Sequence, residues 1–145
     1  MMNSTISAEL GLHLVVPHEE LYVPLAATLT YSAEDPYAVR ISFHAGLDEP
    51  IEWVIGRELL TAGLHGPQGL GDAQVWPTSA VEENGTESDV LNIELSSPFG
   101  HAHFQAPAGD MAEFLHHTEQ VVPVGSEGAH IDFEAELSDL LREAL

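Results

Sequence analysis

The sequence predicts a single α+β domain in which antiparallel strands outnumber helices. Three observations indicate this fold class: the first third of the chain alternates apolar and polar residues, stretches with apolar residues at helical spacing follow, and no long linker divides the chain. A chain of 145 residues is ordinarily one domain, and its 44% of hydrophobic residues can fill a core. We therefore expect one domain over residues 1–145.

Four strands joined by short turns are expected first. From Ile6 to Val16, an apolar residue occupies every second position, as in a strand with one buried face. The same alternation returns three more times, each time after polar or proline-containing turn residues. The strands are therefore expected over residues 6–16, 23–31, 39–43 and 51–55. Their short connections favour an antiparallel meander.

A helix and a second set of strands should follow. Arg57 to Leu64 has leucines at helical spacing, and Gly63 or Gly66 could provide a left-handed cap. Gly66 to Gly71 is expected to form a glycine-rich loop, followed by strands over residues 73–77, 90–96 and 101–106. The polar, acidic stretch over residues 81–89 is expected to be a solvated hairpin loop.

Two further helices complete the expected fold. Pro107 suits the first turn of the second helix, and four residues of that helix share one side: Met111, Phe114, Leu115 and Thr118. Residues 121–128 are expected to form a linker. The last helix should begin near Asp132, with an apolar stripe comprising Phe133, Leu137, Leu140 and Leu141.

The charge of the chain excludes several classes of function. Three arginines and no lysine stand against 24 acidic residues, so the formal net charge is −21. Nucleic-acid binding requires Lys and Arg side chains on phosphates, and an anionic membrane surface would repel this chain. No apolar run approaches the roughly 18 residues of a membrane span, and the N-terminus lacks a signal-peptide pattern. We therefore expect a soluble cytoplasmic protein with no direct membrane insertion.

The sequence offers little support for catalysis. It contains no cysteine and no lysine, which excludes thioester and Schiff-base chemistry, and it has no Gly-x-Ser-x-Gly motif. His101 and His103 are two apart on an expected strand and could together bind a metal ion, with carboxylates as further ligands. A simple polar strand face explains the same pattern. We predict no enzyme activity, no metal and no cofactor, and a His/carboxylate metal-binding protein is the alternative.

Two residues are candidate partner-binding positions. Trp76 is out of phase with the apolar residues of its strand and precedes Pro77, so an exposed interface anchor and ordinary packing are equally good interpretations. Gly125 ends the Pro-led segment Val-Pro-Val-Gly between two expected helices, where a positive φ suits glycine. It could set the angle of the last helix and thus shape a partner-facing edge; a plain loop glycine is the alternative. Trp53, in phase with Ile51 and Ile55, is expected in the core.

Short motifs are spread over residues 5–141: DPYAV at 35–39, FHAG at 43–46, EWV at 52–54, RELL at 57–60, GLH at 63–65, GLGD at 69–72, VWP at 75–77, LSSP at 95–98, AP at 106–107, VPVG at 122–125 and ELS at 136–138. Together they resemble the motifs of the SsgA-like proteins, the actinobacterial regulators of sporulation-specific cell division, and in particular those of the SsgB-type branch.

This resemblance implies a fold, a function and partners. The fold would be Whirly-like, with two packed antiparallel sheets of about seven to eight strands, three helices and a trimeric assembly. The function would be non-enzymatic: helping to position the division GTPase FtsZ at the septum, with FtsZ and other SsgA-like or divisome proteins as partners. A single-stranded nucleic-acid-binding Whirly-like module is a further alternative, which the acidic charge of the chain disfavours.

Overall fold

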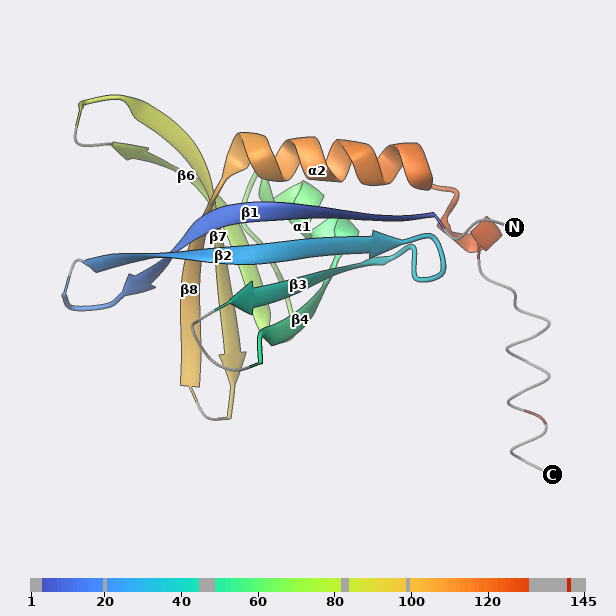
Figure 1. Cartoon of the computed structure of the whole chain (residues 1–145), viewed down its shortest axis with the longest axis horizontal. Helices are drawn as coiled ribbons and strands as arrows, with labels where there is room; N and C mark the ends of the chain where they lie inside the picture. The colour runs from blue at the N-terminus through green and yellow to red at the C-terminus, as the bar shows by residue number, and fades with distance from the viewer. Residues whose placement is uncertain are drawn as a thin grey trace.

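In the described part of the chain, one antiparallel sheet of eight strands dominates the fold. In this computed structural model, the structure describes residues 4–19, 21–44, 49–81, 84–98, 100–130 and 141. The strand order across the sheet is β4-β3-β2-β1-β8-β7-β6-β5 (Figure 1). The elements are β1 (Thr5–Val16), β2 (Leu21–Ser32), β3 (Ala38–His44), β4 (Ile51–Gly56), α1 (Arg57–Gly63), β5 (Gln68–Leu70), β6 (Ala73–Val81), β7 (Glu87–Ser97), β8 (Gly100–Pro107), α2 (Ala108–Val121) and the short 3₁₀ helix η1 (Glu127–His130).

The first four strands form the predicted meander. β1 and β2 pair without interruption from Thr5 opposite Ser32 to Val16 opposite Leu21. Along both strands, burial alternates with the period of two seen in the sequence, because only one face of the sheet meets the core. The buried side chains of this half are Leu10, Leu12, Ala27, Leu29, Tyr31, Val39, Ile41, Phe43 and Ile55.

The two halves of the sheet are continuous, so the described strands form one curled sheet in place of the two packed sheets that were expected. β1 pairs with β8 through three residue pairs, from His13 opposite Gln105 to Val15 opposite His103. Beyond this short junction the sheet curls. In Figure 1, β1 and β2 run horizontally, whereas β7 and β8 run vertically. Phe43 and Phe104 stack between the halves with ring centroids 4.3 Å apart. The expected strand number of about seven to eight is confirmed.

The second half contains more strand than expected. β6 and β7 pair from Ala73 opposite Leu95 to Val81 opposite Glu87, so the prediction of a loop over residues 81–89 is wrong for both ends of that stretch. The turn between the two strands contains Gly85, whose φ is +83°. β5, which pairs with β6, also lies in the predicted glycine-rich loop.

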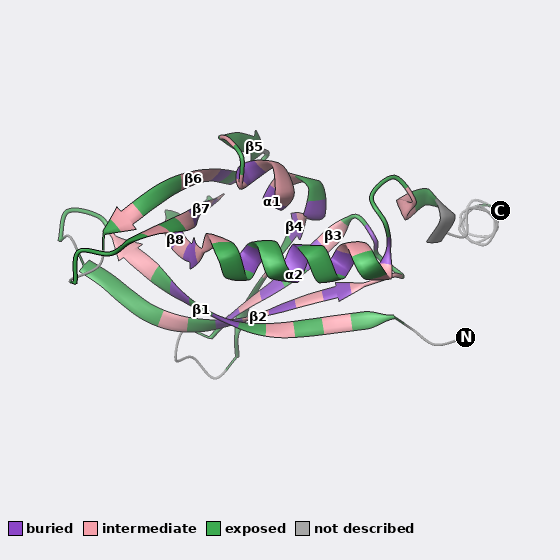
Figure 2. Cartoon of the chain, turned by 90° about the horizontal axis from the view of Figure 1, so that it is seen from above, coloured by how far each residue is buried: buried purple, intermediate pink, exposed green. Residues whose placement is uncertain are grey.

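The two described α-helices fall where the sequence places them. α2 buries Met111, Phe114, Leu115 and Thr118, the side predicted to be apolar, and Figure 2 shows this stripe along the helix. Pro107 lies at the N-cap of α2, one residue before the helix begins. The last predicted helix, from about Asp132, lies almost wholly outside the described residues. The likeness to Whirly proteins stays a prediction.

Neither Gly63 nor Gly66 forms the predicted left-handed cap, because neither has a positive φ. The C-cap residue of α1 is instead Leu64, which has the right-handed helical conformation. Gly63 is buried, and a Cβ atom there would collide with the side chain of Val75. Because Gly63 has no side chain, α1 can pack closely on β6.

Candidate functional site

Arg57, the first residue of α1, is a charged side chain inside the fold. Its side chain is 4% exposed, and its Nη1 donates hydrogen bonds to the carbonyl oxygens of Thr118 at 3.2 Å and Val122 at 2.7 Å. Its Nη2 donates to Glu127 Oε1 at 2.7 Å. The Thr118 carbonyl also accepts the Val122 N–H at 2.9 Å, whereas the Val122 carbonyl lies beyond the last turn of α2, where Arg57 supplies its donor. Arg57 therefore connects the start of α1 to the end of α2 and to the segment after it.

An aromatic ring completes the environment of this guanidinium. The Arg57 guanidinium carbon lies 5.0 Å from the centroid of the Tyr31 ring, within the range of a cation–π contact. The Tyr31 hydroxyl donates to the Pro36 carbonyl at 2.8 Å. Burial raises the pKa of Tyr31, with the positive charge of Arg57 opposing this shift. This role of Arg57 was not predicted from the sequence, although it is one of only three arginines and directly follows a half-buried strand.

The turn that contains Gly125 lies beside this arginine. The Ser126 N–H donates to the Pro123 carbonyl at 2.9 Å, and Gly125 has a φ of +92°. This is the third position of a β-turn, where a positive φ is the mark of a type II turn and favours glycine. The predicted positive φ is thus confirmed. The helix whose angle Gly125 was expected to set lies outside the described residues.

Glu127 joins the turn to the arginine. Its Oε1 accepts from Arg57, and its Oε2 accepts from the Gly125 N–H at 2.9 Å. The pKa of the Glu127 carboxyl is lowered from its ordinary 4.5, first by its own backbone N–H and then by the hydrogen bond from Arg57, while burial opposes the shift. The carboxylate therefore stays ionised near neutral pH and holds the Gly125 turn against α1.

A cleft of about 630 Å³ opens between α1, β5 and this turn. Its rim carries exposed apolar side chains: Val124 is 70% exposed and Tyr37 is 54% exposed. Apolar side chains exposed next to a rigid turn are suited to contact with another protein. The lining residues are Tyr37, Gly56, Arg57, Glu58, Leu59, Thr61, Ala62, Gln68, Gly69, Val124, Gly125 and Glu127.

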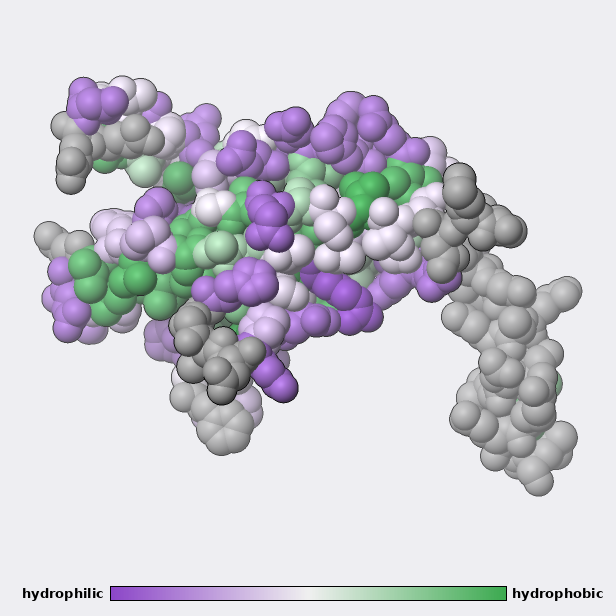
Figure 3. Space-filling model, viewed as in Figure 1, coloured by the Kyte–Doolittle hydropathy of each residue, from purple (hydrophilic) through white to green (hydrophobic). Residues whose placement is uncertain are grey.

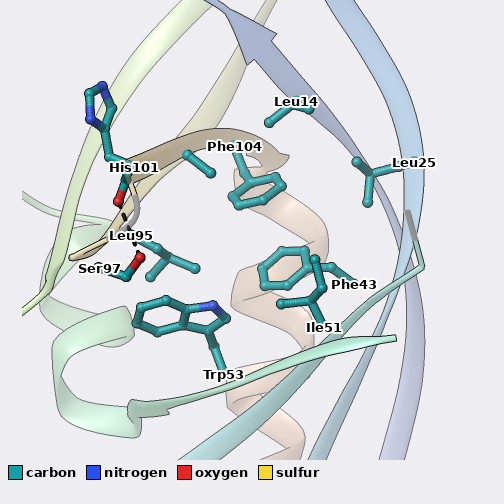
Figure 4. Close-up of a pocket in the computed structure, with 11 residues that line it drawn as sticks. Leu14, Leu25, Phe43, Ile51, Trp53, Leu95, Ser97, His101 and Phe104 are labelled. Carbon is teal, nitrogen blue, oxygen red and sulfur yellow. Dashed lines mark hydrogen bonds between the residues drawn. The ribbon is translucent and has the colours of Figure 1, made fainter. Parts of the chain in front are cut away.

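A second, apolar pocket of about 370 Å³ lies between the two halves of the sheet (Figure 4). The stacked rings of Phe43 and Phe104 line it together with the Trp53 ring. The ring of His101 points away from it. Trp53 is half-buried and packs against the core, as expected from its phase. The remaining apolar lining consists of Leu14, Leu25, Ile51, Leu95 and Ala102.

Exposed apolar residues also gather at the tip of the β1–β2 hairpin. Leu21, Tyr22 and Val23 are exposed at the start of β2, and Figure 3 shows hydrophobic surface at this end of the molecule. This tip is a further candidate contact surface.

Trp76 lies on the outer face of the sheet. It is half-buried, and its ring stacks on His103 with centroids 5.2 Å apart. Its carbonyl accepts a hydrogen bond from Asn92 Nδ2 at 3.1 Å. Trp76 thus packs within its own sheet and keeps part of its ring accessible; a role in binding a partner stays a prediction.

Asn92 is the buried centre of this outer-face cluster. Its Nδ2 donates to the Trp76 carbonyl and to Thr78 Oγ1, while its Oδ1 lies 2.8 Å from His103 Nε2 and accepts from Gln105 at 3.0 Å. This arrangement places a proton on His103 Nε2. Burial lowers the pKa of His103, with the charge of Glu94 opposing the shift.

The predicted His101–His103 pair does not converge on a common ligand. Both residues belong to β8, but His103 is bound to Asn92. Within the described ranges, no group of three or more His, Asp or Glu side chains could hold a metal ion. No helix in the same ranges is long and apolar enough to cross a membrane.

The fold and these surfaces define an α+β protein whose candidate sites are suited to contacts with other proteins. Residues 25–127 match the family described as Streptomyces sporulation and cell division protein, SsgA. The chain belongs to this family.

Relatives and solved structures agree with this assignment. Sporulation-specific cell division protein SsgB of Thermobifida fusca is 47% identical over 95% of this chain and 96% of its own length. SsgB of Streptomyces coelicolor is 46% identical over 99% of this chain and 100% of its own length.

Two solved structures match the whole fold. A structure of the T. fusca SsgA-like sporulation-specific cell division protein has a TM-score of 0.81 at 45% identity, covering 94% of this chain and 96% of that one. A second, reported with the finding that mutations in SsgB correlate to longitudinal cell division during sporulation of S. coelicolor, has a TM-score of 0.80 at 46% identity. It covers 90% of this chain and 98% of that one.

Proposed function

We propose that this chain is a non-enzymatic regulator of sporulation-specific cell division that helps to position FtsZ at septum sites through protein–protein contacts. The observation that carries the proposal is the near-full-length identity of 46–47% to SsgB sporulation-specific cell division proteins. The exposed apolar residues around the Gly125 turn supply a surface on which such contacts can form.

The proposed mechanism is docking by an oligomer. In a trimer, which the family resemblance implies, each copy would present the same Gly125 turn and the same Trp76 face. Several weak contacts to a polymer of FtsZ would then add through effective concentration. The apolar tip of the β1–β2 hairpin is the surface that we propose for self-association. The protein would act in the cytoplasm at the septum, with other SsgA-like or divisome proteins providing any attachment to the membrane.

The charge constrains the kind of contact. FtsZ is itself expected to be acidic, and this chain has a net charge of −21, so long-range attraction would not bring the two together. The contact should instead depend on apolar burial and hydrogen bonds. Its strength should then change little with salt, or increase as salt screens the repulsion.

A pull-down with purified FtsZ, paired with a measurement of oligomer size, tests the proposal. Val124→Ser at the rim of the Gly125 cleft should weaken capture of FtsZ without changing oligomer size. Val81→Ser is the matched control. Val81 is 68% exposed, close to the 70% of Val124, but it is the last residue of β6 and does not line the cleft. No capture by the unaltered protein would refute the proposal, and equal losses in the two variants would refute the cleft as the contact surface.

A further inference from the structure

β4 is an open edge of the sheet. In the part of the chain that the structure describes, it is the terminal strand of the order and pairs with β3 alone. The Arg57 N–H donates to the Tyr37 carbonyl at 2.8 Å, and these two residues directly continue the β3–β4 register beyond its end pair, Ala38 opposite Gly56. Because hydrogen-bonded and non-hydrogen-bonded pairs alternate in an antiparallel ladder, Glu52 and Val54 direct their N–H and C=O groups away from β3. Among the described residues, no backbone hydrogen bond reaches these groups.

This edge has few of the features that prevent strands from adding to a sheet. The register with β3 runs without a bulge from Phe43 opposite Ile51 to Ala38 opposite Gly56. The strand contains no proline or lysine, and its only charged residue is Glu52. Val54 is 52% exposed, so the edge is accessible. An edge of this kind is a template for another strand.

The apolar pocket of Figure 4 lies along the same strand. Ile51 and Trp53 of β4 line it, and Ile51 is 47% exposed. Leu95, on β7, lines the pocket from the other half of the sheet. In an added strand, every second side chain would lie on the same face as Ile51 and Trp53. Apolar side chains at those positions would be buried over this pocket.

The charges around the edge favour a basic occupant. Glu49 and Glu58 are exposed next to β4, and the exposed Glu52 on β4 shares its charge with Arg40. Arg40 is already paired with Glu52 at 2.9 Å, and Arg57 is buried. A second copy of this chain is a poor occupant because it has no lysine and a net charge of −21.

From these observations we infer that the free edge of β4 binds an extended segment of another protein as an added strand. The segment carries apolar residues at alternate positions and Lys or Arg beside them. Main-chain hydrogen bonds from Glu52 and Val54 supply affinity, and the pocket and the acidic rim select the side chains. This inference goes beyond the proposed function, because it specifies the chemistry of the segment and holds whether or not FtsZ is the protein that carries it.

A designed peptide tests the inference on the full chain. The probe is the labelled peptide Lys-Val-Thr-Leu-Lys-Val-Thr-Leu-Lys, and its control has Glu in place of every Lys. We expect binding of the basic peptide alone, accompanied by slower amide hydrogen exchange at Glu52 and Val54. Val54→Pro removes one outward-facing N–H and should weaken binding about tenfold, whereas Val54→Thr, which keeps the N–H, should bind as the unaltered chain does.

Two N-methylated peptides provide a readout that needs no protein variant. Each peptide carries methyl groups on alternate amides. One peptide therefore lacks the N–H groups that face β4, and the other lacks those that face away from it. Only one of the two peptides should lose binding. Equal binding by both methylated peptides, equal binding by the acidic control, or unchanged exchange at Glu52 and Val54 would overturn the inference. The result is separate from the FtsZ pull-down, which uses Val124 and Val81 variants and can fail independently.

Discussion

Arg57 Nη2 lies 2.7 Å from Glu127 Oε1, across 70 residues of sequence. The same guanidinium donates to the carbonyl oxygens of Thr118 and Val122. The Glu127 carboxylate in turn accepts the N–H of Gly125. The start of α1, the end of α2 and the turn proposed to contact a partner are therefore held together by one buried cation.

Replacing this cation should destabilise the fold strongly. Arg57→Met keeps the length of the side chain but leaves the Val122 carbonyl without its donor and Glu127 without its cation, while the Thr118 carbonyl keeps the Val122 N–H. We expect a loss of about 2–4 kcal/mol in the free energy of unfolding, measured by urea denaturation. Arg40→Met is the matched control, because Arg40 forms an ion pair with Glu52 on the exposed face of the sheet. That change should cost at most about 1 kcal/mol. Equal losses of unfolding free energy in the two variants would show that the burial of Arg57 does not determine its contribution to stability.

The contribution of Glu127 should depend on pH. Its folded-state pKa lies below the ordinary 4.5, so the carboxylate stabilises the fold above pH 4.5, where it is ionised in both states. As the pH falls from 4.5 through the folded-state pKa, the unfolded chain takes up the proton first and this stabilisation is lost. The difference in unfolding free energy between the unaltered chain and Glu127→Gln should therefore shrink over that range. Subtracting the two curves removes the effect of the other carboxylates, and a difference independent of pH would contradict the assignment.

Gly125 should tolerate a side chain poorly because of its backbone conformation alone. Its φ is +92°, yet a Cβ atom at this position would have open space within 4 Å. Gly125→Ala should therefore cost about 1–2 kcal/mol, and Gly125→Asn less, since asparagine tolerates positive φ better. Gly66→Ala is the control, because Gly66 is equally uncrowded but has no positive φ. Thermal unfolding that ranks Gly66→Ala as the more damaging change would disprove this explanation.

The stacked pair of Phe43 and Phe104 should couple the two halves of the sheet. Their rings are 4.3 Å apart and nearly parallel, with an interplanar angle of 17°. A double-mutant cycle with Phe43→Leu and Phe104→Leu should give a coupling of about 0.5–1.5 kcal/mol. Additive losses in unfolding free energy would show that the two rings contribute independently.

The parts of the fold that the sequence predicts are those with one buried face. β1 to β4 alternate apolar and polar residues because one side of each strand meets the core. α2 likewise shows its buried side in the spacing of Met111, Phe114, Leu115 and Thr118. In these elements, the local pattern and the tertiary packing have the same cause.

The features that the sequence could not predict depend on contacts between distant residues. The ends of the β6–β7 hairpin are mostly exposed, so they lack apolar alternation and resemble a loop in sequence. The junction of β1 with β8 consists of three pairs, and no local pattern specifies it. The positive φ of Gly125 followed from its turn sequence, but its link to Arg57 through Glu127 required the fold.

Co-sedimentation of the purified chain with GTP-polymerised FtsZ, over a series of salt concentrations, tests the proposed docking function most directly. We predict that the chain sediments with the polymer and that the bound fraction stays constant or rises as salt screens the repulsion between two acidic proteins. A chain that remains in the supernatant at every salt concentration, or binding that disappears as salt is raised, would contradict the proposed function.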